Sequence, residues 1–393
     1  NLDQFERLVK RDRNHASVML WSLGNEETGV QNTELGQRMA RTLVQRQREL
    51  DPSRLSTYGG NNGINFKGIN QEMDVRGFNY HIAELDDYHK EHPSQPIVFS
   101  EVSSMVSSRG MYVKDSIKGY LPDYDMNKPR WGQNAEQWWK FTVERPWLMG
   151  GFVWTGFDYR GEPTPFTWPN INSHFGIMDV CGFPKNTYYY YQSWWTDKDV
   201  IKIYPHWNGH KIGDKVNVWC NSNADEVELV LNGRSLGRKG MPRNGHLEWN
   251  VIYEPGKLEA IGTKNGKIIR TAVETTSAAY QIVLTPDRKS ITADGRDVSV
   301  INVSVLDKQG REIPDAMNMI QFKLNGNATI LGVGNGDPSS HEADKCLDGN
   351  WKRSLFNGKC QIILESMDKE GDFSLTATAD GLQNATATIQ MKK

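Results

Sequence analysis

Short apolar segments alternate with segments of helical periodicity in the N-terminal half of the chain. The strand-like segments are residues 17–25, 55–58, 75–80, 96–100 and 151–154. Strands that alternate with helices in this way are typical of parallel βαβ units. The first strand is not followed by the glycine-rich phosphate turn of a doubly wound sheet. We therefore predict a (β/α) barrel, although the predicted strands are too few to close one.

The helices between these strands are predicted from apolar residues at helical spacing. They are residues 1–10, residues 33–50 and residues 134–145. The partial apolar stripe of the longest helix consists of Leu35, Met39, Leu43 and Leu50. A chain that begins on a helix leading directly into a buried strand is expected to be part of a longer protein.

The C-terminal half instead alternates apolar and polar residues with a period of two. Residues 215–220 and 226–233 show this alternation, and the second segment ends on an Asn-Gly pair typical of a hairpin turn. Residues 298–305 and 373–379 show it again. Short strands between Gly, Asn and Asp turns predict two immunoglobulin-like β-sandwiches. Their role is expected to be structural or ligand-positioning, because neither contains a reactive-looking cluster of ionisable residues.

These patterns predict a multidomain protein. The predicted domains are a partial barrel at residues 1–198, one sandwich at residues 199–277 and a second at residues 278–393. A chain of 393 residues is long enough for two or three domains.

Composition narrows the class of partner. The net charge is −2, and lysine and arginine occur without runs, so neither nucleic acid nor an anionic membrane surface is expected to bind. No apolar stretch reaches the length of a membrane span. The four cysteines lack CxxC spacing, which argues against a metal cluster, and buried free thiols are the default interpretation. A disulfide between Cys346 and Cys360 stays open if the protein is exported.

Two glutamates follow apolar strands directly. Glu26 ends the segment from Ser17, and Glu101 ends the segment from Pro96. In a (β/α) barrel, the carboxyl ends of the strands form the active-site face. A pair of carboxylates is what cleavage of a glycosidic bond requires. Either glutamate alone could instead start a surface helix, where the helix dipole favours negative charge, but the pair in one repeating pattern favours catalysis.

The residues around both glutamates resemble the signatures of glycoside hydrolase family 2, in particular its β-galactosidase-like members. The similar segments are residues 11–15, residues 21–26, Ser100-Glu101 and residues 150–159. The resemblance covers residues 1 to about 195 and implies a (β/α)₈ barrel whose acid/base ends strand four and whose nucleophile ends strand seven. This chain would then hold strands four to eight, the C-terminal half of the barrel, followed by the two sandwiches. Strands one to three and two further domains would lie upstream.

The resemblance also implies roles for individual residues. Glu26 corresponds to the general acid/base, and Glu101 corresponds to the nucleophile of a retaining enzyme. Asn25 resembles the residue that hydrogen-bonds the sugar 2-hydroxyl. Tyr80 resembles the tyrosine that hydrogen-bonds the nucleophile, and Trp154 resembles the aromatic floor under the sugar ring.

Each of these binding residues has a structural alternative. Asn25 could be a turn residue, Tyr80 an amphipathic packing residue and Trp154 a core residue. His81 could reach a sugar hydroxyl or lie on the surface.

The sugar is predicted from one substitution. Glucuronide-cleaving relatives carry an Asn-x-Lys motif whose lysine meets the substrate carboxylate, and His174 stands where that lysine would be. This favours a neutral sugar, with galactose as the first choice. A β-mannosidase, a β-glucuronidase and a non-catalytic carbohydrate-binding fragment stay open.

The expected partner is an oligosaccharide or glycoside substrate. We expect no cofactor and no metal ligand set within this chain, since cation ligands of such enzymes would lie upstream. The resemblance implies a periplasmic or secreted bacterial protein, and the oligomeric state is left open.

Overall fold

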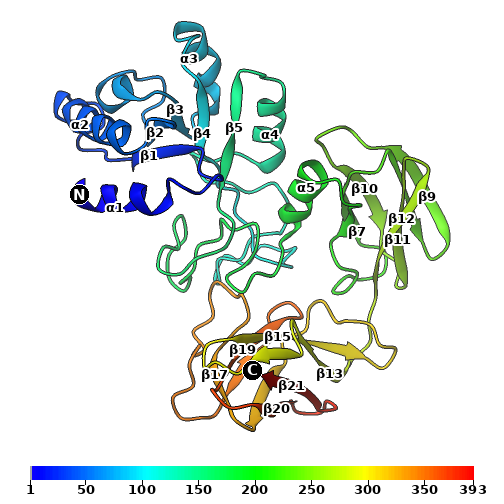
Figure 1. The fold of residues 1–393 in the computed structure, drawn as a ribbon. Coiled ribbons are helices and arrows are strands. Elements are labelled where there is room, and N and C mark those ends of the chain that lie inside the picture. The colour runs from blue at the N-terminus through cyan, green and yellow to red at the C-terminus, as the bar shows by residue number, and fades with distance from the viewer. Residues whose placement is uncertain (1) are drawn as a thin grey trace. The chain divides into compact units, whose positions relative to one another are not determined.

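The computed structural model describes residues 2–393, which form two compact units. The parallel-sheet unit runs up to Met105 and continues through Lys128–Thr155, and the sandwich unit combines Val106–Asn127 with Gly156–Lys393 (Figure 1). The predicted boundaries at residues 198 and 277 fall in the connections that precede β6 and β13, and they stay predictions.

The parallel-sheet unit is built on one sheet. Its strands are β1 (Leu20–Asn25), β2 (Leu55–Gly60), β3 (Arg76–Asn79), β4 (Ile97–Ser103) and β5 (Leu148–Trp154). Every neighbouring pair is parallel, and the spatial order β1-β2-β3-β4-β5 follows the sequence. A doubly wound sheet reverses its strand order at a switch point, whereas this sheet keeps one winding direction. The predicted strands and their parallel arrangement are therefore confirmed.

One helix precedes these strands and the others connect them. They are α1 (Leu2–Asp12), α2 (Glu34–Leu50), α3 (Leu85–Glu91), α4 (Ala135–Val143) and the 3₁₀ turns η1 (Gly68–Glu72) and η2 (Ile82–Glu84). The α2 helix begins after Thr33, whose side chain accepts a hydrogen bond from the Gly36 amide and so caps the helix.

The apolar stripe predicted for α2 is right at Leu50, which is buried, and wrong at Leu35 and Met39. Its buried face is formed by small and medium residues, Gly36, Ala40, Val44, Gln47 and Leu50. Leu35 and Met39 are instead 50% and 48% exposed. The reason is close packing, because a Cβ atom on Gly36 would lie 2.1 Å from the Val30 carbonyl oxygen.

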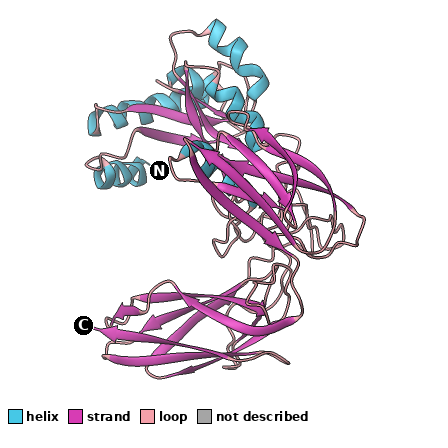
Figure 2. Cartoon of the chain, turned by 90° about the vertical axis from the view of Figure 1, so that its right-hand side faces the viewer, coloured by secondary structure: helices cyan, strands magenta, loops and turns pink. Residues whose placement is uncertain are grey.

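The sandwich unit contains two pairs of sheets. The strands of the first pair are β6 (Ile201–Tyr204), β7 (Lys215–Ser222), β8 (Glu226–Leu231), β9 (Arg234–Gly240), β10 (Leu247–Ile252), β11 (Lys257–Lys264) and β12 (Lys267–Glu274). The strands of the second pair are β13 (Ala279–Pro286), β14 (Ser290–Thr292), β15 (Val298–Asp307), β16 (Met319–Asn325), β17 (Ala328–Gly334), β18 (Lys352–Ser354), β19 (Cys360–Ser366), β20 (Gly371–Thr378) and β21 (Ala385–Lys392). In the first pair, the strand orders of the two sheets are β10-β7-β6 and β12-β11-β8-β9. In the second pair they are β13-β15-β19-β17 and β14-β21-β20-β16-β18. Figure 2 shows these strands joined by loops.

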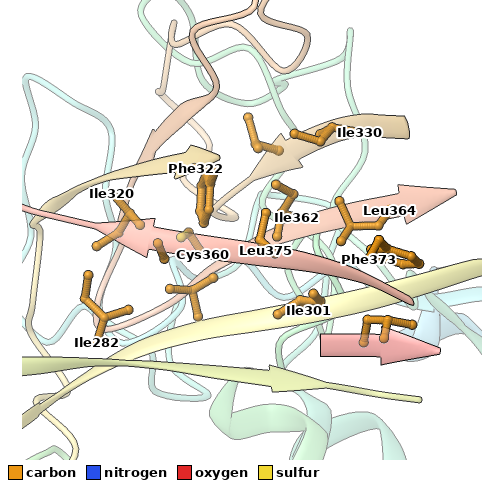
Figure 3. Close-up of a cluster of buried hydrophobic side chains, with 14 of the residues drawn as sticks. Ile282, Ile301, Ile320, Phe322, Ile330, Cys360, Ile362, Leu364, Phe373 and Leu375 are labelled. Atoms are coloured by element: carbon orange, nitrogen blue, oxygen red, sulfur yellow. The ribbon is translucent and has the colours of Figure 1, made fainter. Parts of the chain in front are cut away.

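Both sandwiches follow the period-two rule expected from sequence. The strand β19 alternates buried and half-buried residues along its whole length, and its inward residues Cys360, Ile362 and Leu364 join a core of branched and aromatic side chains. Figure 3 shows these side chains between the strands of the second sandwich. The predicted hairpin turn is present, since Asn232 and Gly233 have φ angles of 50° and 82°.

Irregular segments that belong to the sandwich unit are held by buried ion pairs. The Lys185 ammonium lies 2.9 Å from an Asp158 carboxylate oxygen, and both side chains are almost fully buried. Arg109 pairs with Asp179 and also donates to the Phe356 carbonyl of the second sandwich.

The helix α5 (Asn186–Trp195) carries the aromatic run of the sequence. It packs against β6 and β7, as expected for an interface with the first sandwich. The Tyr190 hydroxyl donates to the Asn244 carbonyl, and the Trp194 indole N–H donates to the Gly245 carbonyl.

Two further properties concern the chain as a whole. All four cysteines, which lie within the described residues, are free thiols, and Cys220 and Cys360 are buried. From residue 2 to residue 393, the helices are too short or too polar to cross a membrane.

Candidate active site

The predicted site residues of the parallel-sheet unit occupy the carboxyl ends of its strands. Asn25 is the last residue of β1, and Glu26 follows it. Glu101 lies two residues before the end of β4, and Trp154 is the last residue of β5. Because all strands run in parallel, these side chains share one edge of the sheet.

Asn79, the last residue of β3, joins these strand ends. Its side-chain amide nitrogen donates to Glu26 Oε1 at 2.7 Å and to Asn25 Oδ1 at 2.9 Å. Its amide oxygen accepts a hydrogen bond of 2.6 Å from the Ser100 hydroxyl. Asn79 is fully buried. The acid candidate on β1 is therefore oriented by a residue two strands away.

Tyr80 holds the second carboxylate. Its hydroxyl donates to Glu101 Oε2 at 3.0 Å and accepts a hydrogen bond of 2.8 Å from the Ser104 hydroxyl. The Tyr80 backbone amide also donates to the Glu101 carbonyl oxygen at 2.8 Å. Burial is the main cause that raises the pKa of the Tyr80 hydroxyl, so it stays a proton donor at neutral pH. The predicted contact between Tyr80 and Glu101 is present.

The environment of Glu101 acts on its charge in two directions. Burial and the negative charge of Glu26 raise the pKa of the Glu101 carboxyl above its ordinary value. Hydrogen bonds from Tyr80, Asn79 and Asn25 lower that pKa and oppose the rise. Two carboxyl groups close enough to interact favour a state with one proton and one negative charge. This is the protonation state that an acid and a nucleophile need together.

The backbone at this edge is unusual. Glu26, Tyr80, Ser103 and Ser104 have φ angles of 55°, 64°, 75° and 55°. L-residues other than asparagine and aspartate rarely adopt this left-handed region, which costs about 1–2 kcal/mol per residue. Such strain persists only where the surroundings enforce it, and it gathers at functional sites.

Gly59, at the end of β2, makes room for the β1 strand end. Its carbonyl oxygen accepts the Glu26 amide hydrogen at 2.9 Å. A Cβ atom at Gly59 would lie 2.3 Å from Asn25 Oδ1, so a side chain there would displace the amide that contacts Asn79.

His81 and Trp154 lie near these groups with their own contacts. The His81 ring places Nδ1 2.9 Å from Glu84 Oε1 and Nε2 3.0 Å from the Asn61 carbonyl oxygen. Both ring nitrogens therefore already have protein partners. Trp154 is partly exposed, and its carbonyl oxygen accepts the Ser104 amide hydrogen at 3.1 Å.

His174 belongs to the sandwich unit and is not grouped with the strand-end residues. It is fully buried, with Nδ1 3.2 Å from the Ser108 hydroxyl and Nε2 2.7 Å from Asn170 Oδ1. Burial, assisted by the positive charge of Lys185, lowers the pKa of His174 to about 3. The imidazole is therefore neutral at physiological pH.

The sequence interpretation missed several members of this network. Asn79 has a recognisable signal, because it is a polar residue that ends a buried strand directly before Tyr80. Ser104 and Gly59 carry no such signal, since a serine after a strand and a glycine at its end occur in ordinary loops.

Comparison with protein families supports a carbohydrate-active enzyme. Residues 1–168 match the model described as the TIM barrel domain of glycosyl hydrolases family 2. Residues 282–388 match glycoside hydrolase family 2 C-terminal domain 5, and residues 213–270 match a domain of unknown function.

Individual relatives agree with these matches. A protein named beta-galactosidase from Bacteroides ovatus is 36% identical over 98% of this chain, and a putative beta-glucuronidase from Formosa agariphila is 30% identical over 94%. The alignments cover 51% and 38% of those proteins, so this chain spans about half of the length of one and less of the other. The crystal structure of a beta-glycosidase from Bacteroides vulgatus superposes with a TM-score of 0.86 at 32% identity, covering 97% of this chain and 52% of that one.

Proposed function

This chain belongs to glycoside hydrolase family 2, and we propose that it supplies both catalytic carboxylates of a retaining exo-β-galactosidase. In this proposal the parallel-sheet unit is the C-terminal half of the (β/α)₈ barrel, strands four to eight. The two sandwiches are immunoglobulin-like domains appended to it. The observation that carries the proposal is the pair of strand-end carboxylates, Glu26 and Glu101, which interact with each other through Asn79, Asn25 and Tyr80.

The proposed reaction has two steps. Glu101 attacks the anomeric carbon while Glu26 gives its proton to the departing glycosidic oxygen, which leaves a galactosyl ester on Glu101 and a free alcohol. Glu26, now ionised, then takes a proton from water, whose oxygen attacks the anomeric carbon and releases Glu101. Both steps invert the anomeric centre, so the product retains the β configuration. This chemistry requires carboxyl groups roughly 5–5.5 Å apart.

The environment supports this division of roles. Burial and the charge of Glu26 raise the pKa of the Glu101 carboxyl, and the hydrogen bonds from Tyr80, Asn79 and Asn25 oppose that rise, as a nucleophile that must ionise requires. The Tyr80 hydroxyl can release Glu101 Oε2 when that carboxylate forms the ester and can recover it when the ester is hydrolysed. The hydrogen bond from the Asn79 amide orients the Glu26 carboxyl group.

The proposed preference for a neutral sugar rests on position 174, where glucuronide-cleaving relatives carry a lysine and this chain has histidine. His174 is neutral and buried, so it lacks the charge that would neutralise a glucuronide carboxylate. The Lys185 ammonium already donates to Asp158 and to the carbonyl oxygens of Ser107 and His174. Desolvating a substrate carboxylate without a paired cation is costly. The similarity to a protein named beta-galactosidase agrees with a galactoside substrate.

The decisive experiment uses the intact protein with 4-nitrophenyl β-galactoside and the matching glucuronide. We expect galactosidase activity with a higher kcat/KM than on the glucuronide, and a β-anomer as the first product seen by NMR. Glu101→Gln should lower kcat by roughly 10⁴-fold or more, the scale seen when a nucleophile is removed. Glu26→Gln should slow poor leaving groups most, because those depend on protonation.

The matched control is Glu91→Gln, which removes an exposed carboxylate at the end of α3 in the same unit. Activity that survives Glu101→Gln would refute the nucleophile assignment, and an α-anomeric product would refute retention. Equal kcat/KM on both substrates would refute the preference for a neutral sugar. If the wild-type protein hydrolyses neither substrate, the alternative of a non-catalytic carbohydrate-binding fragment is favoured.

A further inference from the structure

The loop between β5 and α5 presents an unusually exposed tryptophan. Trp168 is 77% exposed, the largest exposed fraction of any tryptophan or phenylalanine between residues 2 and 393. Burial of an indole contributes a large favourable free energy to folding. Trp168 does not gain most of that free energy, because its side chain stays exposed. Single exposed apolar side chains are common on protein surfaces, so the case for a binding role rests on how the Trp168 ring is held.

The ring is backed by a residue of the second sandwich. The His341 imidazole lies over the Trp168 indole with ring centroids 4.3 Å apart and an interplanar angle of 38°. His341 is itself held, because its Nε2 lies 2.9 Å from the Pro169 carbonyl oxygen. The two rings are therefore in tilted contact, while most of the indole surface stays exposed.

The backbone that follows Trp168 is anchored to the same sandwich loop. The amides of Ile171 and Asn172 both donate to the Pro338 carbonyl oxygen, at 2.9 and 3.3 Å. Asn170 Oδ1 accepts a hydrogen bond of 3.1 Å from the Ser339 hydroxyl. An exposed aromatic ring on a braced loop loses little conformational entropy when a ligand covers it, which is the condition for efficient recognition.

We propose that the exposed face of Trp168 is a platform on which one sugar ring of an oligosaccharide stacks. This inference rests on the proposed function, and it extends that function from a single terminal sugar to a carbohydrate chain. One face of a β-linked pyranose presents C–H groups and is apolar, while the ring edge carries hydroxyls that stay in water. That amphipathic shape matches a single indole ring, which is apolar on its faces and surrounded by solvent.

The surroundings favour a sugar over a protein partner. The exposed residues that precede Trp168 in the loop are Gly161, Glu162, Thr164, Pro165 and Thr167, which include no large apolar side chain. A stable protein interface buries about 800 Å² on each partner around a dense apolar centre. One tryptophan among polar neighbours is too small a centre for that, but it is sufficient for one pyranose ring.

The test measures oligosaccharide binding by calorimetry in the intact Glu101→Gln protein, which cannot consume its ligand. The probes are a β-linked galactotetraose and free galactose. Trp168→Ala should weaken binding of the tetrasaccharide about ten-fold, the scale of one lost aromatic stacking contact. Binding of galactose should stay unchanged. Trp168→Tyr should restore most of the affinity, because it keeps an aromatic face.

The matched control is Trp195→Ala, which removes another exposed tryptophan (43%) that is also stacked on an aromatic ring, that of Tyr191. This variant should bind the tetrasaccharide as the parent does. Equal tetrasaccharide affinity of Trp168→Ala and its parent, equal weakening by both alanine variants, or no measurable tetrasaccharide binding by the parent would each overturn the platform. Hydrolysis of 4-nitrophenyl β-galactoside by the wild-type protein tests the proposed function separately, since that substrate carries only one sugar.

Discussion

The strand ends of the parallel sheet and the hairpin turns of the sandwiches solve the same backbone problem with different residues. Both regions contain left-handed residues that are not glycine. In the sandwich unit these are Asn232, Asn244, Asn265 and Asn357. In the parallel-sheet unit they are Glu26, Tyr80, His81, Ser103 and Ser104. Asparagine tolerates this conformation through local hydrogen bonds, so the turns follow local preference. The residues at the strand ends adopt the left-handed conformation against their local preference. The tertiary structure therefore holds them in it, as is typical of functional sites.

The interiors differ in the same way. The strand β19 buries apolar side chains on one face, as a sandwich requires. The strand β3 is buried along its whole length and includes Arg76 and Asn79. Burial lowers the pKa of Arg76 to about 10, and its guanidinium donates to Asn70, Asn62 and two backbone carbonyls. One interior is therefore stabilised by burial of apolar area, while the other maintains a polar network.

The largest expected effect tests the apolar interior. Leu375→Ala removes a fully buried side chain from β20. The free energy of unfolding of the variant should be about 2–5 kcal/mol lower than that of the parent, which is the cost of a large-to-small change in a core. The kcat/KM on a galactoside should not change at temperatures where the protein stays folded. Calorimetric unfolding and initial rates provide the two measurements.

The control for this variant is Thr376→Ala, on the opposite face of the same strand, where only a small change is expected. A loss of activity in folded Leu375→Ala would contradict the separation between stabilising and catalytic regions.

The second prediction concerns a strand end, where we expect a large loss of activity and a smaller loss of stability. Asn79→Ala should lower kcat/KM by about 10²–10³-fold, the scale of losing one preorganised donor. The free energy of unfolding should fall by only about 1–3 kcal/mol for the unpaired partners left behind. Asn250→Ala serves as the control, because Asn250 is an exposed asparagine on β10. Comparable kcat/KM in both variants would show that the Asn79 network is structural.

The third prediction concerns pH. The nucleophile must be ionised, so kcat/KM should rise as pH increases through the pKa of Glu101. The hydrogen bond from Tyr80 lowers that pKa. Tyr80→Phe removes the bond, which raises the Glu101 pKa further and should move the acid limb of the kcat/KM profile to higher pH.

Tyr280→Phe, a change in the second sandwich, should leave the profile in place. An acid limb that moves to lower pH in Tyr80→Phe would mean that the hydroxyl does not stabilise the Glu101 carboxylate.

The smallest effect tests the turns. Asn265 has a φ angle of 48° in the turn between β11 and β12. Asn265→Ala should destabilise the first sandwich by about 1 kcal/mol, because alanine is strained in the left-handed region. Asn265→Gly should cost only a few tenths of that, since glycine tolerates the conformation. Equal losses in the two variants would show that the side-chain contacts of Asn265 matter more than its backbone.

Much of the fold could be predicted because it depends on local periodicity. The parallel strands and the alternating sandwich strands appear within a few residues of their predicted positions. The α2 stripe is wrong at Leu35 and Met39, because the buried face of this helix needs small residues such as Gly36 and Ala40. A helix pattern reports which residues are apolar, but it does not report how closely the next element approaches.

The sequence by itself determined the two glutamates as the candidate acid pair, because each directly follows an apolar strand and the signatures around them are specific. Only the tertiary structure decided how their charges are managed. Asn79 and Tyr80 come from the end of β3 and Ser104 from the end of β4. Their hydrogen bonds to Glu26, to Glu101 and to each other exist only once parallel pairing brings the strand ends to one edge. The state of His174 was decided in the same way, since burial and the nearby Lys185 make neutral a residue whose type alone permits either charge.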